Sequence, residues 1–272
     1  MRWSERQVAM LQEMGIRVWD APAQGDEVAL AGPAPATAAA PSPAVAPNIA
    51  PNTARNTAPD VEPAAAPLRG PRPSGVATMD WPALRDAVAG CTACKLCSGR
   101  TQTVFGVGNP QAHWMVVGEA PGEQEDRQGE PFVGKSGQLL DSMLRALGLT
   151  RGEAEPARQV FIANTLKCRP PGNRNPEPDE LAQCEPFLIR QIELVKPRMI
   201  LAMGRFAVQS LLRSSEPVGR LRGKVHRYQG VPLVVTYHPA YLLRNPEDKA
   251  RAWDDLCLAL EQMKPMDPTP DA

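Results

Sequence analysis

Short apolar segments alternate with amphipathic ones from residue 114 to residue 237, and this alternation is the strongest constraint on the fold. Four segments are typical of buried strands: HWMVVG, QVFIAN, RMILAMG and VPLVVT. Their continuous apolar character suits strands covered on both faces. Between them lie segments with helical spacing: GQLLDSMLRALGL, which should end at Gly148, DELAQCEPFLIRQIELVKP, with an interruption expected near Pro186, and RFAVQSLL. Strands that alternate with helices predict a mostly parallel sheet between two helical layers, a three-layer α/β/α fold.

Polar residues follow three of these predicted strands. GEAPG follows the first strand, TLKC the second and YHPAY the fourth. In a parallel sheet, ligands bind beyond the carboxyl ends of the strands. We therefore expect these three segments to converge on one crevice.

The chain before this region has a different composition. Residues 21–78 consist mostly of Ala, Pro, Asn, Ser and Thr, and the chain's 30 prolines are about twice the usual share of roughly 5%. Such a composition cannot bury a core, so we expect a disordered linker. A short amphipathic helix is predicted over 1–20, a folded domain over 79–265 and a disordered tail over 266–272.

Neither net charge nor hydropathy indicates an extended nucleic-acid surface or a membrane partner. The 30 Lys and Arg residues balance the 30 Asp and Glu residues, so any nucleic-acid surface must be local. The sequence contains no apolar run that would serve as a signal-peptide core or a membrane span. We expect a cytoplasmic protein that acts as a monomer and has no membrane partner.

Four of the six cysteines form two pairs that suit a metal site. Cys91 and Cys94 are spaced C-x2-C, and Cys168 and Cys184 are spaced C-x15-C. In a reducing compartment, such cysteines are expected to be ligands or free thiols rather than disulfides. By spacing alone, a structural zinc ion and an iron–sulfur cluster remain equal alternatives, because both accept four thiolates.

The other two cysteines have different contexts. Cys97 extends the first pair to C-x2-C-x2-C, which also resembles a ferredoxin-type run, and its role stays open. Cys257 lies on the apolar face of the last predicted helix. We expect it to be a small buried hydrophobic residue.

Four motifs resemble those of the family 4 uracil-DNA glycosylases, in the same order. They are GEAPGEQED, EPFVGKSGQLL, NTLKCRPPGNRNP and HPAYLLRNP, with CTAC upstream, and the resemblance covers nearly all of residues 85–262. It implies an enzyme that flips uracil out of DNA and hydrolyses its glycosidic bond, releasing free uracil to start base excision repair. It also implies a 4Fe–4S cluster held by Cys91, Cys94, Cys168 and Cys184, in a pattern in which position 97 is not a ligand.

A flipped base must be held by stacking and by hydrogen bonds to its edge. The resemblance implies that Gly118, Phe132 and Asn164 lie in the uracil pocket. Phe132 would supply an aromatic face that replaces the lost stacking. The side-chain amide of Asn164 offers a donor and an acceptor to O4 and N3–H, the edge that distinguishes uracil from cytosine.

Cleavage of the glycosidic bond develops positive charge on the sugar and negative charge on uracil. We expect His238 to donate a hydrogen bond to uracil O2, and Glu119 to orient the attacking water and stabilise the sugar cation. Related glycosylases of another family carry an aspartate at the position of Ala120. The division of labour between Glu119 and Glu125 therefore stays open.

Three segments carry basic and apolar candidates for gripping DNA: RPPGNRNP and LRGKVHRY, expected in loops or at strand edges, and LLRNP. The expected phosphate contacts are Arg169, Arg174, Arg222, Lys224 and Arg227. The gap left by a flipped nucleotide is expected to be filled by a wedge, for which the candidates are Leu242, Leu243 and Arg244. The sequence does not choose among these three.

Two other functions are alternatives to glycosylase activity. A relative that captures uracil-DNA covalently would need a nucleophilic histidine in the loop after the second strand, and NTLKCRPPGNRNPEPDEL contains none. An accessory role in replication is the other alternative, since relatives have been labelled as fragments of phage-type DNA polymerase. Nothing in the sequence resembles a polymerase metal site.

The amino terminus carries a second, shorter resemblance. Residues 6–19, RQVAMLQEMGIRVW, are similar to the amino-terminal peptide of the psi subunit of the bacterial clamp loader. The similarity implies docking to clamp-loader subunits through an apolar peptide. The alternative is a helix without a partner.

Overall fold

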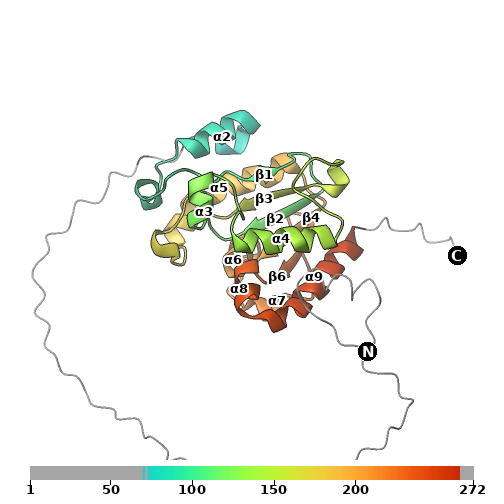
Figure 1. Cartoon of the computed structure of the whole chain (residues 1–272). Coiled ribbons are helices and arrows are strands. Elements are labelled where there is room, and N and C mark those ends of the chain that lie inside the picture. Colours follow the sequence, from blue (N-terminus) through green and yellow to red (C-terminus); the bar gives the residue numbers. More distant parts are fainter. Residues whose placement is uncertain (1–69, 71–72, 264–272) are drawn as a thin grey trace, which may run out of the picture. The chain divides into compact units, whose positions relative to one another are not determined.

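The structure is a computed structural model that describes residue 70 and residues 73–263 (Figure 1). The predicted helix 1–20, the clamp-loader peptide 6–19, most of the predicted linker and the tail 266–272 lie outside the described residues. Val76 is buried in the core. Packed structure thus begins before residue 79, the predicted start of the folded domain.

The described residues form helices and strands in alternation. The strands are β1 (Val107–Gly108), β2 (Trp114–Gly118), β3 (Val160–Asn164), β4 (Met199–Met203), β5 (Val225–Tyr228) and β6 (Val231–Thr236). The α-helices are α2 (Trp81–Ala89), α3 (Glu123–Gln128), α4 (Lys135–Ala146), α5 (Pro178–Val195), α6 (Arg205–Leu212), α7 (Val218–Leu221), α8 (Pro239–Arg244) and α9 (Lys249–Gln262). Short 3-10 helices are η1 (Val76–Thr78), η2 (Lys95–Ser98), η3 (Pro156–Arg158), η4 (Pro171–Asn173) and η5 (Pro246–Asp248).

The strands of the described chain form one six-stranded sheet in the order β1-β3-β2-β4-β6-β5. The four central strands are parallel, and the two edge strands run antiparallel to their neighbours. The central strands are the four that the sequence predicts, so the mostly parallel α/β architecture is confirmed. The edge strands were not predicted because β1 has two residues and β5 alternates exposed and half-buried positions instead of forming an apolar run.

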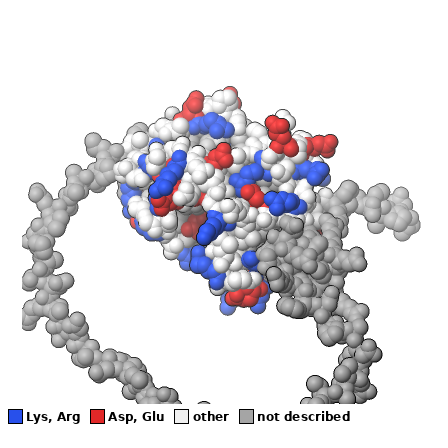
Figure 2. Space-filling model, viewed as in Figure 1, with Lys and Arg blue, Asp and Glu red and all other residues white. Residues whose placement is uncertain are grey.

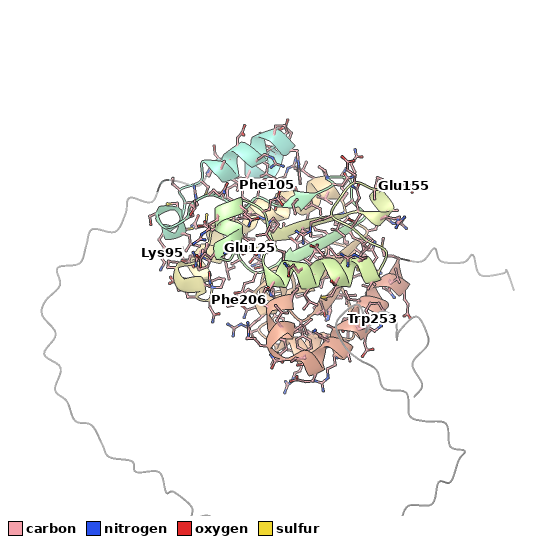
Figure 3. All side chains as sticks on the ribbon, viewed as in Figure 1. Lys95, Phe105, Glu125, Glu155, Phe206 and Trp253 are labelled. Atoms are coloured by element: carbon pink, nitrogen blue, oxygen red, sulfur yellow. The ribbon has the colours of Figure 1, made fainter. Side chains whose placement is uncertain are left out.

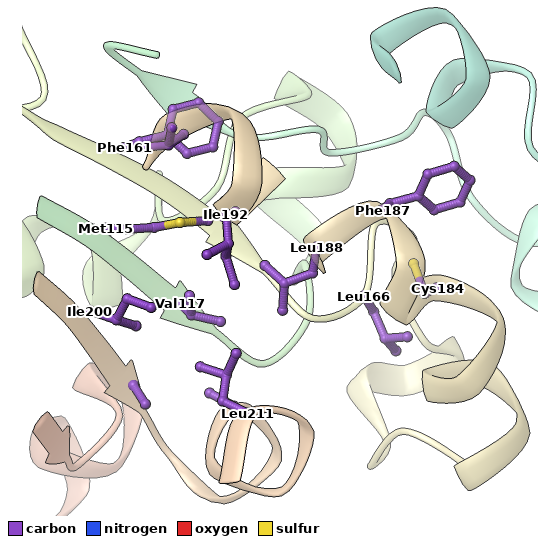
Figure 4. Packing of buried hydrophobic residues seen from close by; sticks show 14 of the residues in the cluster. Met115, Val117, Phe161, Leu166, Cys184, Phe187, Leu188, Ile192, Ile200 and Leu211 are labelled. Carbon is purple, nitrogen blue, oxygen red and sulfur yellow. The ribbon is translucent and has the colours of Figure 1, made fainter. Parts of the chain in front are cut away.

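Alternate strand residues divide into two hydrophobic clusters, one on each face of the sheet. Met115 and Ile200 belong to the first cluster, beside Ile192 of α5 (Figure 4). Leu201 belongs to the second cluster with Trp253 of α9, which is labelled in Figure 3. Helices α2, α5 and α6 contribute to the first cluster, and α4, α8 and α9 to the second. The three predicted layers are therefore present.

A glycine after α4 and a proline inside α5 affect their helices differently. After α4, Gly148 has a φ of 76°, its amide donates to Arg145 O (2.9 Å), and the Leu149 amide donates to Leu144 O (2.9 Å). This is a Schellman motif, and it ends the helix at the predicted glycine. By contrast, α5 runs through Pro186 without the predicted interruption. Buried residues that follow the proline, Leu188 and Ile192 among them, pack in the first hydrophobic cluster, and this packing offsets the lost hydrogen bond.

No helix between residues 73 and 263 is long and apolar enough to cross a bilayer.

Candidate active site

The four parallel strands end at one edge of the sheet, beside a crevice. There Gly118 of β2 pairs with Asn164 of β3. Thr165 ties the two following loops together: its amide donates to Gly118 O (3.0 Å) and its Oγ1 donates to Glu119 O (2.5 Å). The crevice brings together four of the predicted functional residues, Glu119, Phe132, Asn164 and His238.

Phe132 and Asn164 meet at Gly118. A Cβ atom on Gly118 would lie 2.4 Å from Asn164 Oδ1 and 2.7 Å from Phe132 Cζ, so this close approach requires a glycine. Phe132 itself has a φ of 56°, in the left-handed region that non-glycine residues rarely adopt and that often marks functional sites. Asn164 Oδ1 is buried and lacks a hydrogen-bond partner among the described residues. A buried acceptor left unsatisfied is costly, so it fits a site that a ligand donor completes.

His238 caps the N-terminus of α8. Its Nδ1 accepts a hydrogen bond from the Ala240 amide (3.1 Å), so Nδ1 carries no proton. Burial, aided by the charge of Arg244, lowers the pKa of His238 to about 4. At neutral pH the imidazole is therefore uncharged, with its single proton on Nε2. The ring stacks on Phe132, with centroids 5.3 Å apart and planes inclined by 26°.

The two candidate carboxylates have different surroundings. Burial raises the pKa of the Glu119 carboxyl above its ordinary value, and the charge of Arg205 opposes the shift. Glu125, which is labelled on α3 in Figure 3, accepts a hydrogen bond at Oε1 from the Val133 amide (3.1 Å). It thereby holds the loop that follows Phe132. Both carboxylates line the crevice, but Glu125 also has this structural contact.

Two of the predicted phosphate contacts are held in ion pairs within the fold. The Arg174 guanidinium donates to both carboxylate oxygens of Glu180 (2.5 and 2.9 Å), which is buried at the start of α5. Arg222 donates from Nε to Asp255 Oδ2 (3.0 Å), and Asp255 is buried. If either arginine turned fully toward a phosphate, a buried carboxylate would lose its charge partner, so both side chains are already engaged within the fold.

The three wedge candidates differ in their burial. Leu242 is buried in the second hydrophobic cluster, so it packs in the core and cannot enter DNA in this conformation. Leu243 is 43% exposed, and Val225 is the other exposed large hydrophobic residue in the described part of the chain. Arg244 is exposed and lines the crevice. Leu243 and Arg244 thus remain as candidates.

The remaining basic candidates lie at the surface or near the crevice. Lys224 and Arg227 are exposed. Arg169 is partly buried, and its Nε donates to Asn173 Oδ1 (2.8 Å), a residue that lines the crevice. On the face seen in Figure 2, basic and acidic side chains are interspersed. This agrees with the balanced composition.

The crevice lining also includes residues that were not predicted, among them one arginine and two tyrosines. Arg205 directly follows the turn after β4, and Tyr237 and Tyr241 flank the predicted His238. The tyrosine rings stack, with centroids 5.0 Å apart. Applying the strand-end rule to β4, as to the other parallel strands, would have found Arg205. The motif YHPAY contained the signal for both tyrosines.

A second cavity lies among the cysteines. Its lining includes Cys91, Cys94, Cys97, Cys168 and Cys184. Among residues 73–263, no three His, Cys, Asp or Glu side chains lie close enough to hold one metal ion. Burial raises the pKa of the Cys168 thiol to about 11 and that of the Cys184 thiol to about 12. Thiolates at these positions therefore need nearby positive charge, such as that of a bound metal.

Two donors point at sulfur atoms of this cavity. Arg100 Nη1 donates to Cys168 Sγ (3.1 Å), and the Lys167 amide donates to Cys184 Sγ (3.2 Å). Hydrogen bonds to sulfur are one of the means by which proteins orient and tune thiolate ligands. The arrangement suits cysteines that act as ligands.

Comparison with known proteins agrees with this geometry. Residues 105–257 match the model of the Uracil DNA glycosylase superfamily. A type-4 uracil-DNA glycosylase of Pyrobaculum aerophilum is 42% identical over 190 residues, which cover 66% of this chain and 93% of the relative. Type-4 uracil-DNA glycosylases of Sulfurisphaera tokodaii (44% over 172 residues; 60% of this chain, 76% of the relative) and Thermotoga maritima (41% over 168 residues; 61% and 84%) are similar.

Proposed function

Because the chain belongs to the uracil-DNA glycosylase superfamily and is a DNA glycosylase of the type-4 kind, we propose that it flips uracil out of DNA and hydrolyses the N-glycosidic bond. Release of free uracil would then start base excision repair. The observation that carries this proposal is the buried, unpartnered amide oxygen of Asn164, which lies beside Phe132 in the same crevice as Glu119 and His238.

Recognition of the base would depend on Asn164 and Phe132. The Asn164 Oδ1 atom, which lacks a partner, would accept from N3–H of uracil, and the amide nitrogen would donate to O4. Cytosine presents the opposite pattern at these two positions. Phe132 would stack on the flipped base, and Gly118 leaves the space in which these groups meet.

Departure of uracil would depend on His238. The amide of Ala240 fixes the ring so that Nε2 carries the proton, and burial keeps the ring neutral at pH 7. A neutral imidazole can donate from Nε2 to uracil O2 as negative charge develops there. Glu119 would orient the attacking water and stabilise the sugar cation. Glu125, which accepts a hydrogen bond from the Val133 amide, would have a supporting role.

For DNA binding, we propose Arg169 and Lys224 as phosphate contacts and Leu243 or Arg244 as the wedge. The two wedge candidates are exposed next to the crevice, whereas Leu242 is part of the core. An apolar or cationic side chain at this place offsets the stacking that the flipped nucleotide loses.

We further propose that Cys91, Cys94, Cys168 and Cys184 hold a 4Fe–4S cluster. These four thiols line one cavity, and they supply the four thiolates that a cubane needs, each of which binds a different iron atom. When bound, the cluster would crosslink segments that lie far apart in the sequence.

The test of the proposed activity is incubation with an oligonucleotide that contains one uracil. We expect free uracil and an abasic site that alkali cleaves, with the protein not attached to the DNA. A stable protein–DNA adduct would instead indicate covalent capture, and unchanged DNA would indicate a role without catalysis. Either result would refute the proposal.

Replacing Asn164 by aspartate should change the base that is read. We expect the rate of uracil release to fall about tenfold or more, because the carboxylate lacks the donor for O4. Loss of one hydrogen bond to the base weakens binding by about this factor. Cytosine release should become detectable, since a carboxylate accepts from its amino group. Single-turnover assays on matched uracil and cytosine oligonucleotides measure both effects. Wild-type selectivity in this variant would contradict the assignment of Asn164.

We also propose, from the sequence resemblance alone, that residues 6–19 dock to clamp-loader subunits and raise the effective concentration of the enzyme near replicating DNA. Removing residues 1–20 should leave uracil release from short DNA unchanged and abolish co-purification of clamp-loader subunits. Pull-down with the full chain and the truncated chain provides the comparison. Absence of those subunits from the full-length pull-down, or loss of catalysis on truncation, would disprove the docking hypothesis.

A further inference from the structure

Lys167 is a buried lysine to which the proposed mechanism gives no role. Its side chain is 1% exposed. Its Nζ donates to the backbone oxygen of Asn164 (2.7 Å) and to Gln191 Oε1 (2.6 Å), and both acceptors are uncharged. A buried ammonium group costs several kcal/mol unless it is well compensated, so its retention calls for an explanation.

The backbone of the same residue contacts the cysteine cavity. The Lys167 amide donates to Cys184 Sγ (3.2 Å), and its carbonyl oxygen accepts from the Val104 amide (2.8 Å). Cys168 is the next residue in the chain. Lys167 is therefore in contact with the cavity through its main chain and with the end of β3 through its side chain.

Gln191 holds the lysine in place. It lies on α5 seven residues after Cys184, which puts the two side chains on the same face of the helix. Gln191 is fully buried, and its Nε2 donates to Phe105 O (2.9 Å) while its Oε1 accepts from Lys167. Both ends of the amide are thus engaged, which fixes the position of the Lys167 ammonium group.

We propose that Lys167 is a positioning residue that links the cysteine cavity to the uracil-reading side chain of Asn164. The inference rests on the proposed function. By anchoring the Asn164 carbonyl, the ammonium group sets the direction in which the Asn164 amide meets the base. Four thiolates around a 4Fe–4S core carry net negative charge, and this charge would compensate the buried ammonium group.

The test is Lys167→Met in the holoenzyme, since methionine fills a similar volume but has no charge and no donor. We expect iron content and visible absorbance per chain to stay near wild type, because the four proposed ligands are unchanged. The inhibition constant for free uracil should rise about tenfold or more, since small errors in position weaken directed hydrogen bonds strongly. Affinity for DNA with an abasic site should stay the same.

A second variant and a control make the result decisive. Gln191→Leu removes one acceptor of the ammonium group and should raise the uracil inhibition constant in the same direction, even where Lys167→Met fails to fold. Lys196→Met changes an exposed lysine at the C-cap of α5, outside the contacts of Lys167, and should behave as wild type.

Several outcomes would overturn the inference. They are a wild-type inhibition constant in folded, iron-containing Lys167→Met protein, a parallel loss of uracil and abasic-DNA affinity, or failure of both variants to fold. Failure of the proposed function is a separate observation, because the wild-type protein would then release no uracil.

Discussion

Replacing His238 by alanine is expected to lower the single-turnover rate of uracil release by about 100-fold or more, the loss typical of a donor aimed at developing charge. The neutral imidazole carries its proton on Nε2, because the Ala240 amide occupies Nδ1 and burial lowers the pKa of His238 to about 4. Alanine removes this donor. The fold should persist, since the histidine lies in the crevice and its backbone still begins α8.

The matched control for this prediction is His113→Ala. His113 precedes β2 at the opposite edge of the sheet, where its backbone oxygen accepts from the Arg198 and Met199 amides. That variant should release uracil at the wild-type rate. A wild-type rate for His238→Ala, measured on folded protein, would refute the role of His238.

The same assay separates the two carboxylates. Glu119→Ala should cut uracil release about 100-fold or more, because the group that orients water and stabilises the sugar cation is lost. Glu125→Gln keeps an oxygen that can accept from the Val133 amide, so its rate should change much less. A larger loss in the Glu125 variant would reverse the proposed division of labour.

Replacing Cys184 by serine is expected to remove the cluster and to destabilise the domain severely. Wild-type protein should be brown and contain iron and acid-labile sulfide at about four each per chain. The variant should lose the colour and most of the iron, and it should unfold at a much lower temperature, because metal binding and folding are coupled when ligands come from distant segments. Cys168→Ser should behave in the same way.

Cys97→Ser and Cys257→Ser are the controls for this experiment. Cys97 lines the same cavity, but the family pattern does not include it as a ligand, and Cys257 lies on α9. Both variants should retain iron, sulfide and thermal stability. Zinc without sulfide in wild-type protein prepared anaerobically would contradict the cluster, and loss of iron in Cys97→Ser would change the ligand set.

The central part of the fold was predictable because its signals are local. Each of β2, β3, β4 and β6 is a short apolar run, and the polar segment that follows it marks the edge where the crevice forms. The edge strands β1 and β5 depend on pairing with a neighbour and carry no comparable signal. The three wedge candidates could not be separated from sequence, because only the formation of α8, which begins at Pro239, places Leu242 in the core.

The parts of the site that sequence could not supply depend on distant partners. Arg222 is paired with Asp255, 33 positions later in the chain, so its ion pair could not be inferred from neighbouring residues. Lys167 was part of a recognised motif, yet its burial and its contact with Gln191 arise only when α5 packs against the loop after β3. Sequence patterns identify residues of reactive types. Burial and ion pairing in the folded protein then decide which of these side chains can contact DNA or the base.

The most direct test of the account is a crystal structure of the protein with free uracil. We expect the base to stack on Phe132, with its N3 and O4 atoms at hydrogen-bond distance from the Asn164 amide and its O2 atom facing Nε2 of His238. Uracil bound elsewhere, or turned so that Asn164 Oδ1 keeps no donor, would contradict the claim that this crevice reads the base.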